Sequence, residues 1–375
     1  MNKKDLNEIR RRFGFERNSL SCIRGCYVQK DGKIISSFDK PMQALPREEA
    51  EKYLAIFRRV LSGEPGQNLL TVDFSPEQVM NSDEHRLLTA LRDSGLRRDE
   101  TVEEMIGKLI SSVRLDDNYL ILMTSDGYDV PFRGADGEKD PDRSDEVFRY
   151  IVCAVCPVRL TKPALTYSPA DGEFHPRESD WAVSAPVLGF MFPAFEERAC
   201  NIYGALMYTK DTDDANEAFV TRVMGADPQM PADIQKRTFS QVLEESLGEE
   251  CSLEAVQSVQ NMVAERTEEA KKDKRAETPV FSALDVRDAL VDGGVSMGRA
   301  EAFIDAYESQ FGPRTVLTGA NVAPKNQFEV KTPAVTIRVD PDRSDLVETR
   351  VIDGRGYILI RADGDVTVNG VAVRI

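Results

Sequence analysis

The feature that most constrains the fold of this chain is the apolar stretch from Asn118 to Thr209. Within it, Tyr119–Thr124 and Tyr150–Val158 are continuous apolar runs rich in β-branched residues, and Asn201–Thr209 closes the stretch in the same manner. Short, uninterrupted apolar runs are typical of strands that are buried on both faces. We therefore expect a central buried sheet here, on which the rest of the chain is built.

Two more strands are predicted inside this stretch, at Lys162–Tyr167 and Ala182–Phe192. Prolines interrupt them, and proline cannot donate a hydrogen bond to a ladder, so these strands should lie at edges and beside loops. The dipeptide Asp126-Gly127 predicts a turn, and the polar residues 133–143 predict a long surface loop.

Amphipathic segments before the stretch supply layers that would cover the sheet. A hairpin at 22–38, turning at Asp31-Gly32, and a strand at 67–74 are predicted among helices that each have one apolar face. These helices are expected at 5–13, 46–61, 76–92 and 101–113. Ser75 followed by Pro76 is an N-cap signal for the third of them.

The character of the chain changes after Lys210. Helices are predicted at 217–223, 232–247 and 253–270, and the charged tract 265–279 indicates a solvated helix end and a linker. A helical pair at 283–291 and 296–311 follows. Regular alternation from 324 to 375, with Asp-Gly and Asn-Gly at the turns, predicts an antiparallel β-meander or a small barrel.

The predicted fold class is α+β. It comprises an N-terminal mixed sheet with packed amphipathic helices, a helical middle segment, and a small C-terminal helical pair with an antiparallel β unit. The corresponding domains are 1–210, 211–272 and 281–375, with a linker at 273–280.

The net charge of −16 argues against diffuse binding to nucleic acid or anionic lipid, because both are polyanions. The first 30 residues nevertheless carry a net charge of +5, which leaves −21 for the rest. Arg10, Arg11 and Arg12 form a candidate basic patch there, able to contact RNA, DNA or an acidic protein. The alternative, which we favour, is that these arginines complement the chain's own acidic surface.

The chain has no N-terminal apolar signal segment and no apolar run near the length of a membrane span. We therefore expect a cytoplasmic bacterial protein with reduced thiols and no membrane partner. A Walker A loop and a Gly-x-Gly-x-x-Gly loop after a strand are both missing from the sequence, so we predict no cofactor.

Four cysteines could supply the thiolates of a structural zinc site: Cys22, Cys26, Cys153 and Cys156. The second pair lies in a predicted strand, where side chains three residues apart point to opposite faces and cannot share one metal. Burial of these thiols as small hydrophobic groups is the better interpretation, and we predict no metal.

The chain has two histidines, and His175 is the one in a plausible site. It lies in a polar, proline-rich loop between Ser168 and Pro186 that ends near the only tryptophan, Trp181. Polar loops on rigid sheets often carry binding or catalytic residues, although a lone loop histidine is more often structural. The candidate ligand or partner site comprises Lys162, His175, Arg177, Trp181 and Arg198. His85, in a polar helix, is expected to be solvated.

The hexapeptide Asp-Pro-Asp-Arg-Ser-Asp occurs twice, at 140–145 and 340–345, and each copy leads into a predicted strand. Its acids could bind a divalent cation. We favour a turn that positions the following strand, because the later glycine and glutamate of a calcium loop are missing from both copies.

Several stretches resemble a bacterial family known as domain-of-unknown-function family 4317, common in anaerobic Gram-positive bacteria. They are MNKKDLNEIRRRF at the start, CAVCPVRLTKPALTY at 153–167, GFMFPAFEERACNIYGALMYTK at 189–210, and FEVKTPAVTIRVDPDRSDLVETRVIDGRGYILI at 328–360. The resemblance spans nearly the whole chain. It implies a full-length intracellular protein and assigns no catalytic residue.

The leading hypothesis is a non-catalytic cytoplasmic binding or regulatory protein with a protein partner. It follows from the scarcity of histidine and the missing cofactor motifs. One alternative is a hydrolase of unfamiliar type that uses the His175 loop. The other is a nucleic-acid or ribosome-associated protein that binds through its basic N-terminus.

Overall fold

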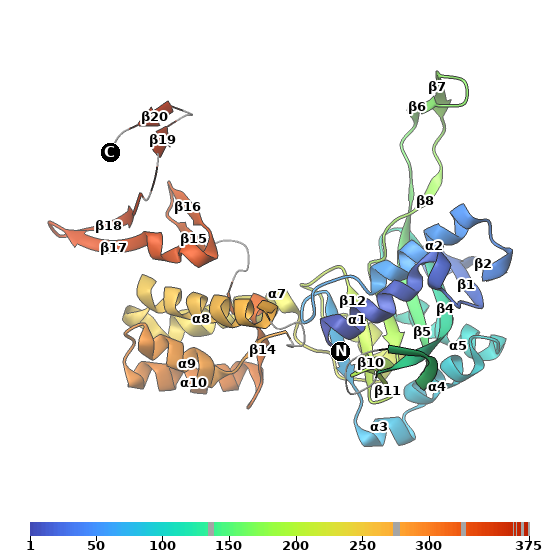
Figure 1. Cartoon of the computed structure of the whole chain (residues 1–375), viewed down its shortest axis with the longest axis horizontal. Helices are drawn as coiled ribbons and strands as arrows, with labels where there is room; N and C mark the ends of the chain where they lie inside the picture. The colour runs from blue at the N-terminus through green and yellow to red at the C-terminus, as the bar shows by residue number, and fades with distance from the viewer. Residues whose placement is uncertain are drawn as a thin grey trace. The chain divides into compact units, whose positions relative to one another are not determined.

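We analysed a computed structural model of the chain (Figure 1). The structure describes residues 1–133, 139–272, 278–323, 328–362, 364, 366–368 and 371–373, without the side chains of 132–146, 341, 342 and 368. Two compact units divide the chain, residues 1–231 and 232–375, and each is described by itself.

The first unit is built on one large antiparallel sheet, where a mixed sheet was expected. Its strands lie in the order β2 (Ile34–Pro41), β1 (Cys22–Val28), β4 (Asn118–Arg133), β5 (Lys139–Leu160), β9 (Leu188–Phe192), β12 (Gly204–Thr209) and β3 (Leu69–Asp73). β8 (Trp181–Val183) pairs with the end of β5. The apolar stretch therefore forms the centre of the sheet, as predicted.

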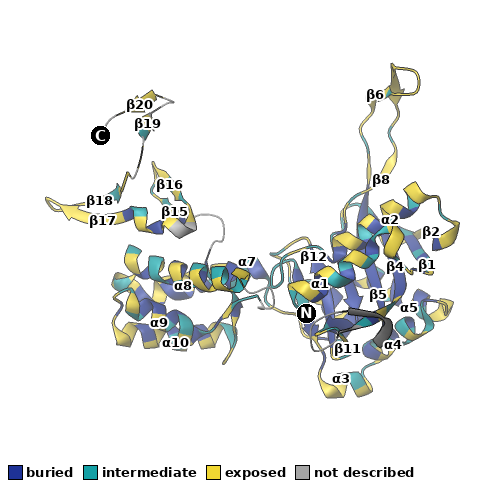
Figure 2. Ribbon diagram, viewed as in Figure 1, coloured by how far each residue is buried: buried dark blue, intermediate teal, exposed yellow. Residues whose placement is uncertain are grey.

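Helices cover both faces of this sheet, so its central strands are buried (Figure 2). One face packs against α1 (Lys3–Arg10), the 3₁₀ turn η1 (Arg11–Phe13) and α2 (Arg47–Val60). The other packs against α4 (Asp83–Ser94), α5 (Asp99–Ser112), α6 (Glu217–Phe219) and the π-helical turn η4 (Val220–Met224). The smaller elements are η2 (Phe15–Arg17), η3 (Met42–Ala44), α3 (Pro76–Asn81), β10 (Ala194–Glu196) and β11 (Ala199–Asn201).

Strand β5 shows how the sequence produces these layers. Its side chains alternate between the faces: Cys153 and Val155 pack beneath α4 and α5, whereas Cys156 packs on the α1 and α2 side. Gly189 lets β9 approach closely, because a Cβ atom there would lie 2.5 Å from the Cys153 carbonyl oxygen and 2.8 Å from Val60 Cγ1. The apolar run therefore forms a strand that is filled from both sides.

The predicted turn at Asp126-Gly127 was wrong. Both residues lie inside β4, where they pair with Tyr150 and Arg149 of β5. Alternating buried residues of the two strands, Val130 and Phe148 among them, extend the ladder past the predicted turn. The predicted loop at 133–143 covers the ends of both strands and residues 134–138, which lie outside the described residues.

The predicted helix at 76–92 is two helices that meet at Ser82. Ser75 caps the first through its Oγ atom, which accepts a hydrogen bond from the Gln78 amide at 3.2 Å. Ser82 ends that helix in an extended conformation and caps α4 through the His85 amide. The predicted N-cap at Ser75 was therefore confirmed. Ser82 is a second N-cap that divides the segment into two helices, and the spacing of the apolar residues did not reveal it.

The second unit contains four helices around one core: α7 (Ala232–Leu247), α8 (Leu253–Lys272), α9 (Ala283–Asp292) and α10 (Met297–Phe311). The short elements η5 (Gly248–Glu250), β13 (Val280–Phe281), β14 (Leu317–Thr318) and α11 (Gly319–Val322) complete this part. Ser282 and Asp285 form the expected capping box of α9. The predicted helical pair thus shares its core with the two helices before it.

The C-terminal strands form three separate antiparallel hairpins where one meander was expected. They are β15 (Phe328–Lys331) with β16 (Thr336–Val339), β17 (Val347–Ile352) with β18 (Arg355–Ile360), and β19 (Val366–Val368) with β20 (Val371–Val373). Asp353-Gly354 turns the middle one with φ of 50° and 76°, as its Asp-Gly signal predicts. Local turn chemistry thus predicted the middle hairpin, and the predicted turn at Asn369-Gly370 lies outside the described residues. It did not determine whether neighbouring hairpins pair.

The second copy of the repeated hexapeptide forms the 3₁₀ segment η6 (Pro341–Leu346) and leads into β17 as predicted. The Gln257 amide of α8 donates to the carbonyl oxygens of Ser344 (2.8 Å) and Val347 (2.9 Å), and Ser344 Oγ donates to Asn261 at 3.0 Å. This copy therefore fixes the chain on α8. The first copy lies within β5, and its side chains are outside the described residues.

The α+β class is confirmed, and the compact units do not follow the predicted domain limits. Residues 211–231 belong to the first unit, where Phe219 and Val223 enter its core, and α7 and α8 belong to the second. Residues 273–277 of the predicted linker lie outside the described residues. Among the described helices, none combines the length and apolar character that crossing a membrane requires.

Candidate functional site

The proline-rich segment after β5 forms a β-hairpin that projects from the sheet, which we call the β-arm (residues 160–183; Figure 1). Its outer part pairs β6 (Ala164–Ser168) with β7 (Glu173–Arg177), and its base pairs β8 with the end of β5. Between these, the Thr161 amide donates to the Asp180 carbonyl oxygen at 2.8 Å. The arm is thus a two-stranded extension of the central sheet.

The register of the arm separates its apolar residues from its polar ones. Residues directly opposite each other in an antiparallel pair lie on the same face. Tyr167 faces Phe174, with ring centroids 5.3 Å apart, and Leu165 faces Pro176. At the base, Leu160 faces Trp181. The outer arm therefore has an apolar face, and its opposite face contains the pairs Thr166–His175 and Ala164–Arg177.

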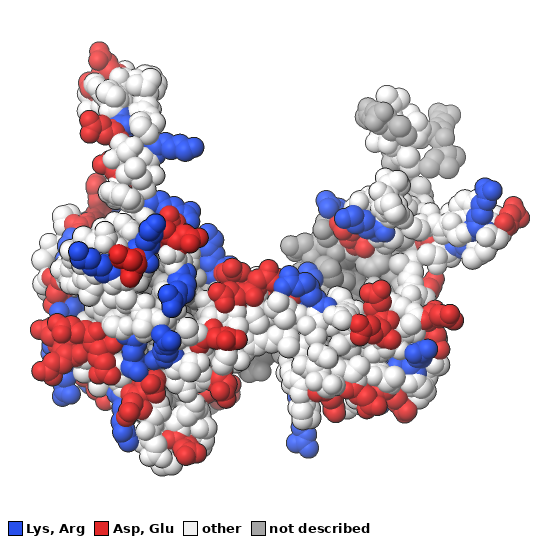
Figure 3. All heavy atoms as spheres, turned by 180° about the vertical axis from the view of Figure 1, so that it is seen from behind, with Lys and Arg blue, Asp and Glu red and all other residues white. Residues whose placement is uncertain are grey.

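These apolar side chains are exposed to solvent (Figure 2). The exposed fraction is 72% for Leu165, 66% for Phe174 and 59% for Trp181, against 0% for Phe190 in the sheet. Figure 3 shows the arm as largely uncharged, with acidic side chains near its tip. A cluster of large apolar groups on a slender hairpin is a feature that marks contact surfaces.

His175 lies on the polar face of the outer arm. Its Nε2 atom is 2.6 Å from Asp171 Oδ2, and about half of each side chain is exposed. Hydrogen bonds from the Ser168 hydroxyl, the Glu173 amide and His175 lower the pKa of Asp171. Asp171 therefore lies between the serine and the histidine, whereas nucleophilic catalysis needs the histidine between serine and carboxylate. The arrangement stabilises the turn at the tip.

The structure brings together four of the five predicted site residues. Lys162, His175, Arg177 and Trp181 all belong to the arm, and an Arg177 guanidinium nitrogen lies 3.5 Å from the Lys162 carbonyl oxygen. Arg198 lies elsewhere: its side chain is 16% exposed and pairs with Glu8 at 2.6 Å. It also donates to the Pro131 carbonyl oxygen. The expectation that all five form one site is not met.

The basic patch is also divided. Arg12 turns inward, where its Nε atom donates to Asp126 at 3.2 Å, its Nη2 atom donates to Ser19 at 2.7 Å, and its guanidinium lies over the Tyr128 ring. Arg11 is exposed and Arg10 is half-buried. One of the three arginines thus neutralises an acid of the same chain.

The cysteines lie where the strand geometry predicts. Cys153 and Cys156 are buried on opposite faces of β5 and cannot bind one metal together. Burial raises the pKa of Cys156 to about 12 and raises that of Cys153 further, so both stay protonated thiols at neutral pH. Among the side chains that the structure describes, His, Cys, Asp and Glu form no group of three suited to a metal ion.

The other histidine is buried, contrary to expectation. His85 is 3% exposed, and its Nε2 atom lies 2.9 Å from the Ile202 carbonyl oxygen, which fixes this nitrogen as the donor. The ring packs edge-on against Phe74 and Phe192. The Ile202 carbonyl oxygen, far away in the sequence, accepts the hydrogen bond that allows His85 to be buried. The polar residues around His85 in the sequence could not reveal this contact.

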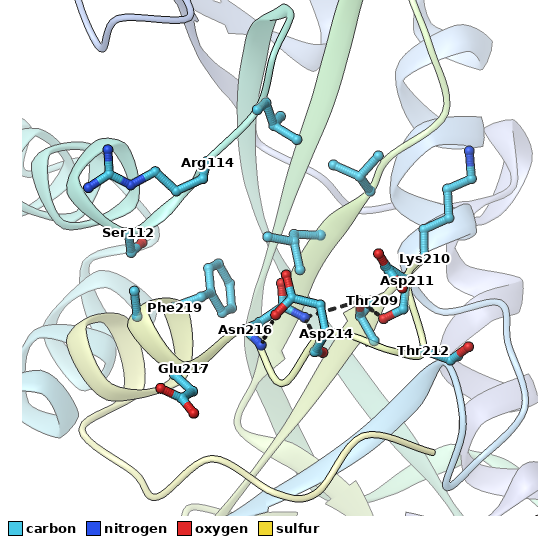
Figure 4. Close-up of a pocket in the computed structure, with 14 residues that line it drawn as sticks. Ser112, Arg114, Thr209, Lys210, Asp211, Thr212, Asp214, Asn216, Glu217 and Phe219 are labelled. Carbon is cyan, nitrogen blue, oxygen red and sulfur yellow. Dashed lines mark hydrogen bonds between the residues drawn. The ribbon is translucent and has the colours of Figure 1, made fainter. Parts of the chain in front are cut away.

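A cavity of about 600 Å³ lies beside the end of β12, but its polar groups bind one another (Figure 4). Thr209 Oγ1 donates to the Asp211 carbonyl oxygen at 2.8 Å, and Asn216 Nδ2 donates to the Asp214 carbonyl oxygen at 2.8 Å. Lys210 and Arg114 lie on opposite sides of the cavity. These groups do not converge on one point, so the cavity is a weaker candidate than the arm.

Sequence reasoning selected the right segment for its polar residues and missed its apolar face. Leu165, Tyr167 and Phe174 are each more than half exposed there, and a prediction based on polar residues does not select them. The available signal was the alternation Leu165-x-Tyr167 and Phe174-x-Pro176 on either side of Asp171-Gly172. That pattern predicts a hairpin with one apolar face.

The two units place the chain in the class of α+β proteins with a helix-covered antiparallel sheet. A family model described as Domain of unknown function (DUF4317) matches residues 1–371, and the chain belongs to this family. No curated protein matches the chain.

Proposed function

We propose that this protein is a non-catalytic binding protein that contacts another protein through the apolar face of its β-arm. The observation that carries the proposal is the exposure of Leu165, Tyr167 and Phe174 on one face of the arm, with Trp181 at its base. Aromatic residues are enriched at protein interfaces, where they provide large contact areas at a small entropic cost.

The construction of the arm supports this role. A two-stranded hairpin in water is only marginally stable by itself, and this one is held by the Tyr167–Phe174 ring contact and by the polar turn around Asp171. A partner that covered the apolar face would remove Leu165 and Phe174 from water. Burial of a large apolar side chain contributes about 1.5–3 kcal/mol, so a few such groups can dominate binding.

Side-chain docking is favoured over addition of a partner strand. Pro176 in the middle of β7 has no N–H group, and Pro163 precedes β6, so the edges of the arm offer an interrupted row of donors. Strand addition needs a continuous row. The specificity of the contact would therefore come from the rings and from Leu165.

The arm is tested by site-specific photo-crosslinking in cells that produce the full chain. A photoreactive phenylalanine analogue at Phe174 probes the apolar face, and the same analogue at Thr166 is the matched control on the opposite face. We expect a discrete crosslinked protein band from position 174 and at most a faint one from position 166. Equal crosslinking from both positions, or none from either, would contradict the proposal.

A second experiment identifies the kind of partner. With the photoreactive group moved to Leu165 on the same face, the double variant Tyr167→Ser/Phe174→Ser should retain the fold and lose the crosslinked partner. Light scattering of the purified wild-type chain then separates two outcomes: a dimer that the double variant abolishes assigns the arm to a second copy, and a monomer assigns it to a different protein. If the double variant still forms a dimer or still binds the partner, the apolar face of the arm is not the contact surface.

A further inference from the structure

We infer that a polar cavity at the end of α4 binds a phosphate group of a small molecule. The cavity has a volume of about 310 Å³, within the range of small-ligand sites, and three separate parts of the first unit form it. Ser19 and Ser21 precede β1, Arg92 to Arg97 end α4 and follow it, and the third part is the middle of the β4–β5 pair. The arm contributes no residue to it.

The charge of this cavity is opposite to that of the chain. Arg92, Arg97 and Arg149 line it, together with Asp93 and Asp126. Three of these charges are neutralised locally, because Arg92 pairs with Asp93 at 2.7 Å and Arg12 pairs with Asp126 at 3.2 Å. Arg97 and Arg149 are exposed and form no ion pair with any carboxylate that the structure describes. A net-negative protein thus holds two available guanidinium groups at one cavity.

The remaining lining groups suit an oxyanion. Four serines also line the cavity: Ser19, Ser21, Ser94 and Ser125. Gly95, with φ of 59°, brings the turn after α4 close to β4, where a Cβ atom would lie 3.6 Å from Ser125 Oγ. Arginine and hydroxyl donors around one volume are the groups that bind phosphate, and arginine can do so with two parallel hydrogen bonds.

The carbonyl groups at the end of α4 do not oppose an anion strongly, because they are already hydrogen-bonded. The Leu96 amide and the Ser94 hydroxyl donate to the Leu91 carbonyl oxygen, and the Gly95 amide donates to that of Arg92. Arg24 donates to the Leu96 carbonyl oxygen with two nitrogens at 3.0 and 3.1 Å. The negative end of the helix dipole is therefore partly compensated.

The carboxylate of Asp126 is enclosed by the protein beside this cavity, because its side chain is 0% exposed. Its Oδ2 atom accepts hydrogen bonds from Arg12 and, at 2.9 Å, from the Tyr150 hydroxyl. Burial and the Asp126 charge raise the pKa of Tyr150 well above its usual value, so the phenol remains a donor. Asp126 therefore does not contact a ligand in the cavity, and Arg12 compensates its charge.

Calorimetry on the full chain tests the site with inorganic phosphate, glycerol 3-phosphate and sulfate at equal ionic strength. We expect the two phosphates to bind, because Arg97 and Arg149 supply charged donors. Tighter binding of glycerol 3-phosphate would assign the site to a phosphorylated metabolite, and tighter binding of phosphate would assign it to the free ion. Sulfate binding tighter than that of either phosphate would contradict a phosphate site.

Variants locate the binding. Arg149→Gln and Arg97→Gln should each weaken phosphate binding about tenfold or more, because each removes a charged donor. Arg149→Lys should restore part of the affinity. The matched control is Arg58→Gln, an exposed arginine of α2 outside this cavity, which should bind as the wild type does. Equal affinity in all variants, or no phosphate binding by the wild type, would overturn the proposal.

Discussion

The inner part of β5 and the β-arm are continuous in sequence and both present large apolar side chains, yet these side chains have opposite environments. Cys153 and Val155 are covered by helices, whereas Leu165 and Phe174 are covered by nothing among the described residues. Both segments are β-structure with apolar side chains. Apolar content alone therefore does not separate a core strand from a contact surface; what separates them is whether amphipathic helices lie over the strand.

The largest expected effect comes from truncating one phenylalanine in each region. Phe190→Ala, next to Cys153 in the sheet, should lower the free energy of unfolding by about 3–5 kcal/mol, because it leaves a cavity in a filled core. Phe174→Ala, in the arm, should change it by less than about 0.5 kcal/mol. Urea titration followed by circular dichroism measures both. Similar losses in the two variants would remove the contrast between the regions.

A smaller effect is expected from adding one methyl group. Gly189→Ala should destabilise the first unit by about 1–3 kcal/mol, since the new Cβ atom would overlap the Cys153 carbonyl oxygen and Val60. Gly127→Ala is the control, because a Cβ atom there meets no atom within 4 Å. Thermal unfolding of both variants checks this expectation. An unchanged midpoint for Gly189→Ala would show that α2 does not pack tightly on β9.

The smallest effect concerns two aspartates, one in each environment. Burial raises the pKa of Asp5 in α1, despite opposing hydrogen bonds from Glu197 and Asn2. Hydrogen bonds from Ser168 and its neighbours lower that of Asp171 in the arm. ¹³C-carboxyl NMR titration, assigned with Asp5→Asn and Asp171→Asn, should place the two pKa values on opposite sides of the ordinary aspartate value. The reverse order would contradict the environments described.

The two shifts have opposite signs in stability. The lowered pKa of Asp171 means that its contribution is present above the ordinary aspartate pKa and is lost as the pH falls through the folded-state value. The raised pKa of Asp5 means that its protonated form favours folding, so this contribution is lost as the pH rises through the folded-state value. Acid should therefore weaken the arm turn through Asp171, whereas protonation of Asp5 should favour the packing of α1.

Much of the fold could be predicted from local pattern. Three-residue spacing correctly assigned Cys153 and Cys156 to opposite faces, and Ser75 and Ser282 correctly marked helix starts. These signals act within one element. The failures have a different origin: Asp126-Gly127 is a turn signal locally, but pairing with Tyr150 and Arg149 keeps it extended. The conformation of Asp126-Gly127 is therefore determined by its pairing with β5 and not by its local sequence.

The candidate sites were less predictable than the fold. Proline and polar content led to the arm segment, but the register that gathers Tyr167 and Phe174 depends on where the hairpin turns. The phosphate cavity combines Ser19, Arg97 and Arg149, which are far apart in the sequence. Only the ladder between β4 and β5 and the placement of α4 beside it bring these residues together. A single sequence contains no signal that these distant residues lie close together in space.

Strand β5 has a mechanical consequence for any partner that pulls on the arm. It is bonded to β4 along one side and to β9 and β8 along the other, and it continues into the arm. Tension along this strand loads those perpendicular bonds in shear, so many must break together. The outer hairpin is closed at its tip by the turn between Ser168 and Glu173, so a pull there loads both of its strands in the same direction and not the bonds between them. Force transmitted through the arm would thus reach β5 and be resisted by its ladders with β4 and β9.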